Sequence, residues 1–114
     1  MGALLVFLGG GLGALLRYGV SKLLPAAVAT FAVNIVGCFL MGVLAAWLMG
    51  REEGESWRLL VGVGLLGGFT TFSAFALDFA TLWRDQPIIA LSYAAASVLA
   101  SVAALFAGMW VGRP

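Results

Sequence analysis

The chain has 114 residues, the length of one domain, and 63% of them are hydrophobic while only 10% are charged. A soluble chain of this size needs far more charge to cover its surface, so the composition excludes a soluble domain and favours an integral membrane protein. The net charge of +1 offers no basic surface for nucleic acid, and the lack of His with a single Cys excludes a His/Cys metal site.

Charged residues separate four long apolar segments, each near the ~20 residues that a helix needs to cross the hydrocarbon core of a bilayer. We therefore predict an all-α membrane protein with one domain, 1–114. Its four transmembrane helices are expected at roughly 2–23, 26–49, 57–83 and 88–111. Pro25 and Pro87 fit the first turns of the second and fourth helices, where a missing N–H costs nothing.

The first segment carries Gly9 and Gly13, and the third carries Gly64 and Gly68 at the same spacing. Small residues four apart let helices approach closely in lipid, and we take these pairs as a signal for an oligomer. Arg17 ends the first apolar run. It could pair with a charge of the third segment, extend to the interface or concentrate anions in a vestibule.

The second segment carries Asn34, the one amide in the middle of a span. Its NH₂ group donates two hydrogen bonds, which suits either an anion or a contact between helices. Thr30 and Cys38 lie one turn to either side on the same helix face, and Cys38 fits a buried, inert thiol.

The third segment contains the sequence Gly-Gly-Phe-Thr-Thr-Phe at 67–72. Paired glycines weaken a helix and threonines can bond their own backbone, so we predict a break in this helix at mid-membrane depth. Backbone groups freed in lipid must be buried in protein, line water or bind an ion. A flexible, glycine-rich packing face is the alternative.

Phe72 and Phe75 follow this motif on one helix face, and their ring edges carry partial positive charge suited to an anion. Simple packing explains the same spacing. The fourth segment carries a stripe of hydroxyls from Tyr93, Ser97 and Ser101, which suits an ion path or contacts between helices. Asp78, near the end of the third segment, could pair with Arg17 or reach the interface.

Lys and Arg are shared evenly between the two sides of the predicted topology, so the positive-inside rule gives almost no preferred orientation. One interpretation is that the chain inserts in both directions, which would allow an antiparallel dimer. The other is a fixed topology set by small biases in charge. The cations on one side are Arg51, Arg58 and Arg113, and those on the other are Arg17, Lys22 and Arg84.

Three parts of the sequence together resemble the Fluc/CrcB fluoride channels. These parts are GGGLGALLRY at 9–18, Asn34 with Gly37, and GGFTTFSAF at 67–75, and the hydroxyl stripe of the fourth segment matches as well. The resemblance covers the whole chain. It implies a passive, selective fluoride channel of the bacterial plasma or inner membrane that exports toxic fluoride, built as an antiparallel, dual-topology homodimer with two pores.

The resemblance also implies a structural Na⁺ held by the backbone carbonyls of Gly67 and Thr70. It places the fluoride pathway along seven residues of the second, third and fourth helices, with Arg17 of the first helix also beside it. Those seven are Asn34, Thr71, Phe72, Phe75, Tyr93, Ser97 and Ser101. Ala74 stands where some relatives have Thr. Fluoride itself does not follow from the residue spacing.

Two other kinds of small membrane protein are the alternatives. A proton-coupled multidrug transporter needs a carboxylate deep in the membrane, and Asp78 is the only candidate here. A holin-like pore or assembly subunit would account for the glycines but not for polar groups on three helices. An enzyme lacks support, since the sequence has no His and no paired buried carboxylates.

Overall fold

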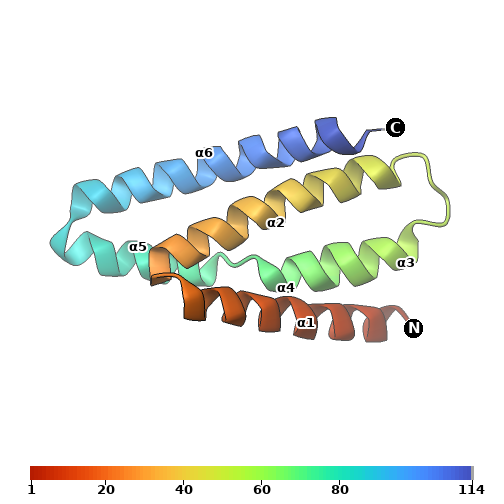
Figure 1. Cartoon of the computed structure of the whole chain (residues 1–114), viewed down its shortest axis with the longest axis horizontal. Coiled ribbons are helices and arrows are strands. Elements are labelled where there is room, and N and C mark those ends of the chain that lie inside the picture. The colour runs from red at the N-terminus through yellow and green to blue at the C-terminus, as the bar shows by residue number, and fades with distance from the viewer. Residues whose placement is uncertain (114) are drawn as a thin grey trace.

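The computed structural model describes residues 1–113, and every regular element in that range is helical. Figure 1 shows a long bundle whose two termini lie at the same end. Three spans are single helices: α1 (Gly2–Leu23), α2 (Ala26–Leu48) and α6 (Pro87–Gly112). The remaining span consists of α3 (Glu55–Trp57), the π-helix η1 (Arg58–Leu66), α4 (Gly67–Phe69) and α5 (Ser73–Asp85).

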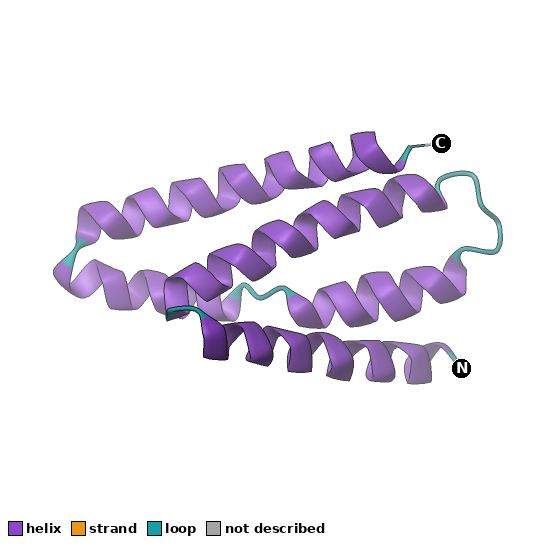
Figure 2. Cartoon of the chain, viewed as in Figure 1, coloured by secondary structure: helices purple, strands orange, loops and turns teal. Residues whose placement is uncertain are grey.

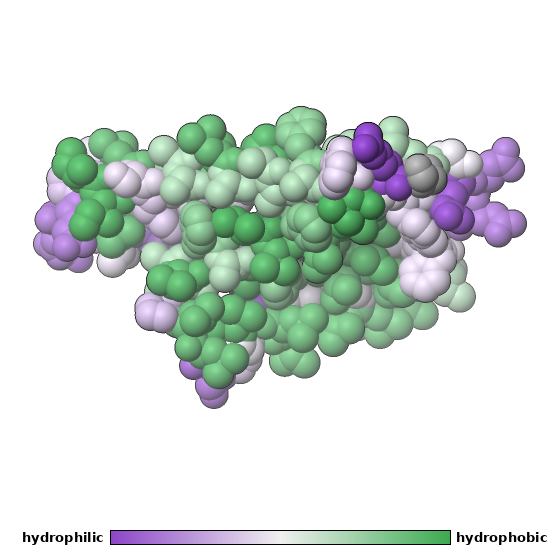
Figure 3. All heavy atoms as spheres, turned by 45° about the horizontal axis from the view of Figure 1, so that its top comes forward, coloured by the Kyte–Doolittle hydropathy of each residue, from purple (hydrophilic) through white to green (hydrophobic). Residues whose placement is uncertain are grey.

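By length and composition, four helical stretches of the chain can cross a membrane, the third of them running from residue 55 to residue 85. The bundle is 50 Å long, enough to pass through a hydrocarbon core of ~30 Å and reach the headgroups on both sides. Large apolar side chains such as Phe7 and Leu99 are mostly exposed along its sides. In Figure 3 hydrophilic residues gather toward the ends, so the apolar flanks are the surface that lipid covers.

Two close helix pairs build the bundle: α2 packs along α6, and α1 packs against η1 and α4. Glycine permits both contacts. A Cβ on Gly42 would overlap the carbonyl oxygen of Leu105, and one on Gly108 would overlap that of Phe39. Helices in lipid gain no hydrophobic drive from each other, so this backbone proximity supplies the van der Waals contact that holds them.

The glycine pairs of the first and third spans meet within the chain. A Cβ on Gly9 or Gly13 would overlap the carbonyl oxygens of Leu60 or Leu65, and Gly64 faces Gly9 in turn. These pairs therefore pack α1 against η1 within one chain, and they are not needed to explain contact with a second copy. The same contact gives Gly9 its role.

The third span leaves the helical conformation at residues 70–72, which Figure 2 shows as a loop between α4 and α5. Thr70 is extended, with φ −83° and ψ 159°. Among residues 1–113, no backbone hydrogen bond joins the N–H groups of 71–74 to the carbonyls of 67–70. The ladder is thus interrupted, and groups that a helix normally satisfies must find other partners.

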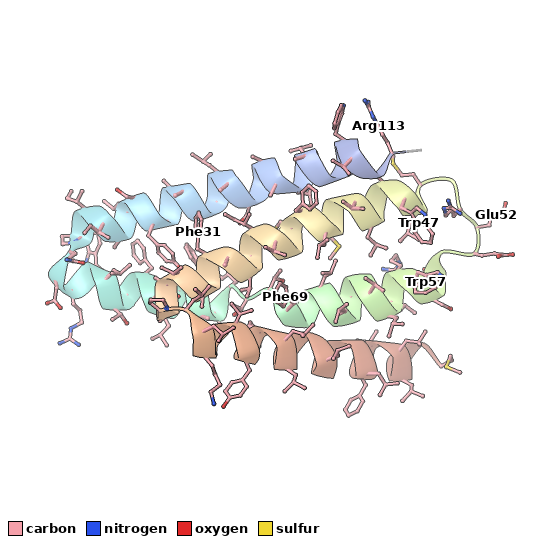
Figure 4. All side chains as sticks on the ribbon, in the orientation of Figure 1. Phe31, Trp47, Glu52, Trp57, Phe69 and Arg113 are labelled. Atoms are coloured by element: carbon pink, nitrogen blue, oxygen red, sulfur yellow. The ribbon has the colours of Figure 1, made fainter. Side chains whose placement is uncertain are left out.

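Aromatic and charged side chains mark the ends of the bundle. At the end with both termini, the ring centroids of Trp47 and Trp57 are 6.4 Å apart, and the Arg51 guanidinium lies 4.4 Å from the Trp47 centroid. Figure 4 places Trp47, Trp57 and Glu52 around the same loop. At the opposite end Trp83 stacks on Phe79. Such rings suit the membrane–water interface.

Candidate functional site

The side-chain amide of Asn34 on α2 forms hydrogen bonds with two backbone groups of the interruption. Its Nδ2 donates to the Thr71 carbonyl at 2.9 Å, and its Oδ1 accepts from the Thr71 N–H at 2.8 Å. The side chain thereby acts as a backbone partner for an extended residue. One N–H of the amide is left over, since the NH₂ group carries two hydrogens.

The two threonines of the motif bond to backbone groups on either side of the interruption. Thr70 Oγ1 donates to the Leu66 carbonyl at 3.0 Å, inside the preceding turn. Thr71 Oγ1 accepts from the Ala74 N–H at 3.1 Å, the bond of an N-terminal cap, and lies 3.3 Å from the Ser73 hydroxyl. These residues therefore end one helix and begin the next. Gly37 makes room for them, because a Cβ there would overlap the Thr70 methyl group.

Arg17 reaches the interruption from α1. Its Nε donates to the Gly68 carbonyl at 3.1 Å. In residues 1–113 the one salt bridge joins Arg58 and Glu55, so Arg17 and Asp78 are not an ion pair. Asp78 instead accepts a hydrogen bond from the Tyr93 hydroxyl at 3.2 Å.

Three aromatic rings continue from the interruption along α5 to α6. The centroids of Phe72 and Phe75 are 5.4 Å apart with the planes at 51°, and those of Phe75 and Tyr93 are 5.3 Å apart at 40°. Tilted pairs of this kind place the edge of one ring toward the face of the next. Phe72 is 77% exposed, so much of its ring lies on the outer face of the single chain.

A cavity of about 270 Å³ lies between α2, α5 and α6, beside the interruption. It combines polar and aromatic side chains from all three helices. Its lining consists of Asn34, Cys38, Thr70, Thr71, Phe72, Phe75, Ser97, Val98, Ser101 and Val102. The Ser97 hydroxyl in this lining is buried and has no hydrogen-bond partner in the described chain. Its oxygen has almost no accessible surface, so it borders the cavity without being open to it.

A second, smaller cavity of about 180 Å³ lies toward the end of the bundle that carries α5's last turn. Arg17, Ser21, Thr30, Thr71 and Asp78 supply its polar groups. Thr71 borders both cavities. Polar side chains of the two cavities therefore lie on either side of Thr71, within linings that are otherwise mainly apolar. Polar groups at this depth are uncommon in a membrane span and often mark an ion pathway.

The structure gathers most of the residues that the sequence indicated. Asn34, Phe72, Phe75 and the two serines of α6 share the first cavity with Thr71. Arg17 borders the second cavity, while Tyr93 joins the site through Phe75 and Asp78. Gly67 faces a separate apolar groove between α2 and η1.

Sequence reasoning missed the hydrogen bond between Asp78 and Tyr93 and the place of Ser21 in the second cavity. The signal for Asp78 was present, because a lone carboxylate inside a span requires a partner. Ser21 carried no signal, since nothing in its spacing separates it from a residue at the interface.

Four helices able to cross a membrane, with polar side chains gathered beside an interrupted helix, are typical of a membrane transport protein. The chain matches the family described as "CrcB-like protein, Camphor Resistance (CrcB)" over residues 4–109 and belongs to that family. The resemblance inferred from the sequence is thereby confirmed.

Relatives that the chain matches over nearly their whole length support this placement. The chain is 50% identical to "Fluoride-specific ion channel FluC" of Novosphingobium aromaticivorans, over 95% of this chain and 93% of that one. It is 47% identical to the protein of the same name from Caulobacter vibrioides, over 96% and 94% of the two chains. "Fluoride-specific ion channel FluC 2" of Nitrobacter hamburgensis is 44% identical, over 99% and 98%. The family is one of channels rather than enzymes, and the chain is a multi-pass protein of the bacterial inner membrane.

Proposed function

We propose that this protein is a fluoride-selective channel that lets fluoride leave the cytoplasm passively and so limits its toxicity. The observation that carries the proposal is the match, over nearly the whole chain, to relatives named fluoride-specific ion channels. The polar side chains of the first cavity support it as well, because they place hydrogen-bond donors and ring edges beside the interruption. No carboxylate lies in the first cavity, whose chemistry therefore suits an anion.

We propose that the pathway follows the polar side chains of the two cavities, from the first cavity past Thr71 to the second. Small, strongly hydrated fluoride needs donors that replace its water. The spare N–H of Asn34 and the edges of Phe72 and Phe75 offer such contacts. The Ser97 hydroxyl belongs to the same lining but is buried. Thr71, Tyr93 and Ser101 continue the line of polar groups, and Arg17 borders its far end.

We propose that the working unit is an antiparallel homodimer with two pores. Gly67, Phe72 and Ser73 are exposed on the outer face of the single chain, next to the interruption. Freed backbone groups do not face lipid, since each unsatisfied group costs several kcal/mol there. A second copy of the chain would cover this face, and the even distribution of Lys and Arg suits opposite insertion.

We also propose that a structural Na⁺ binds at the interruption. The carbonyls of Gly67 and Thr70 receive no backbone hydrogen bond from 71–74 among the residues described. Carbonyl oxygens from an unwound helix are suitable Na⁺ ligands. A side-chain metal site has no candidate, because residues 1–113 hold no cluster of three His, Cys, Asp or Glu. When bound at these carbonyls, Na⁺ would supply positive charge that holds the two copies together.

The test is ion efflux from liposomes containing the purified protein. We expect rapid release of fluoride, little release of chloride, and no requirement for a proton gradient. Equal release of both anions would overturn selectivity. Proton-dependent uptake of a lipophilic cation with no fluoride release would identify a multidrug transporter instead.

A further inference from the structure

The guanidinium of Arg17 is bonded to the main chain of another helix. Arg17 is half-buried at the end of α1, and its Nε donates to the Gly68 carbonyl, 51 positions along the chain. No carboxylate lies within salt-bridge distance of Arg17 in the part of the chain that the structure describes. Its contact is therefore with a backbone dipole and not with a side-chain charge.

The Gly68 carbonyl lacks its ordinary helical partner. In an unbroken helix it would accept from the N–H of residue 72, but no such bond forms at the interruption. The N–H groups of Thr71 and Ala74 are bonded to side chains instead. A carbonyl left unpaired at this depth is costly, so a hydrogen-bond donor that reaches it stabilises the interruption.

Close packing brings Arg17 to this position. A Cβ on Gly68 would meet the backbone of Gly10, and one on Gly13 would overlap the Leu65 carbonyl. Gly13 and Arg17 are four residues apart and share one face of α1. The glycines set the distance between the backbones, and Arg17 then reaches the carbonyl one turn further along.

We propose that Arg17 is a positioning residue that caps the first half of the third span. Arg17 binds the Gly68 carbonyl, whereas the carbonyls of Gly67 and Thr70 in the same motif stay free. This proposal rests on the fluoride channel proposed above. It differs from a role in which the charge of Arg17 draws anions into the second cavity.

Two conservative variants separate these roles. Nε is the fourth side-chain atom of Arg, and the Nε2 of Gln stands at the same number of bonds from Cα. Arg17→Gln therefore keeps a donor for Gly68 without the charge. Arg17→Lys keeps the charge, but its nitrogen lies one bond further out. Arg17→Leu removes both, and Arg84→Leu is the control, because Arg84 is exposed at the same end and lines neither cavity.

The experiment measures two quantities for each full-length variant: fluoride efflux from liposomes and hydrogen exchange of the amides at 67–75 in detergent. A cap predicts that Gln stays within about threefold of the parent in both quantities. Leu should lose about tenfold or more of the flux and exchange faster, with Lys closer to Leu than to Gln. Arg84→Leu should match the parent.

Flux retained by Lys but lost by Gln, with unchanged exchange in both, would overturn the cap and favour attraction of anions by charge. If Arg17→Leu does not fold, the comparison of Gln with Lys decides the question. If the parent releases no fluoride, the proposed function fails, whereas faster exchange at 67–75 in Lys but not in Gln would still establish the cap.

Discussion

Replacing Asn34 with Leu tests whether its amide holds the interruption together. Leu has a similar volume, so the change removes the two hydrogen bonds to Thr71 without opening a large cavity. The Thr71 N–H and carbonyl would then have no partner. Each buried unsatisfied group costs ~1–3 kcal/mol, and because the site is only part-buried we expect the variant to lose about 2–4 kcal/mol of unfolding free energy.

The assay is denaturant titration in mixed micelles, followed by helical signal, with fluoride efflux measured on the same preparations. Ser92→Ala is the matched control, since Ser92 is exposed and bonds only to the carbonyl of Ile88 on its own helix. We expect the control within ~0.5 kcal/mol of the parent. Asn34→Asp should also be less stable than the parent. One carboxylate oxygen still accepts from the Thr71 N–H, but the other is an acceptor opposite the Thr71 carbonyl, which is an acceptor too. A loss below ~0.5 kcal/mol for Asn34→Leu would refute the reasoning.

Three further outcomes follow from the structure. Gly13→Ala should destabilise the protein by about 1–3 kcal/mol despite the better helix propensity of Ala. Gly11→Ala is the control: its added Cβ meets nothing within 4 Å, so it should be neutral or stabilise by up to ~1 kcal/mol. Equal effects of the two in denaturant titration would contradict the close α1–η1 contact. Phe75→Ile should reduce fluoride efflux while the fold is retained. Phe7→Ile, at an exposed position of α1, is the control and should leave the flux unchanged. Parental flux in the Phe75 variant would reject its place in the pathway. Brief dialysis into Na⁺-free buffer should leave the flux intact because a deeply buried ion exchanges slowly, and full activity in protein proven free of the ion would make the Na⁺ assignment wrong.

The sequence by itself determined the environment and the helical architecture. Uncharged runs between charged residues set four spans, because a chain in lipid must satisfy its backbone groups within each segment. It also indicated where the third span is weakest, since Gly67, Gly68 and the two threonines all lower helix stability, and the chain does leave the helical conformation at Thr70.

Tertiary structure alone decided which groups satisfy the interruption. Asn34 bonds to a backbone 37 positions away and Arg17 to one 51 positions away, and no local pattern specifies such partners. The same holds for the glycine pairs, which the sequence could not assign to one chain or two. Helix propensity and hydropathy depend on neighbours within a few residues, whereas these contacts depend on how closely whole helices pack, which is fixed only when the bundle is assembled.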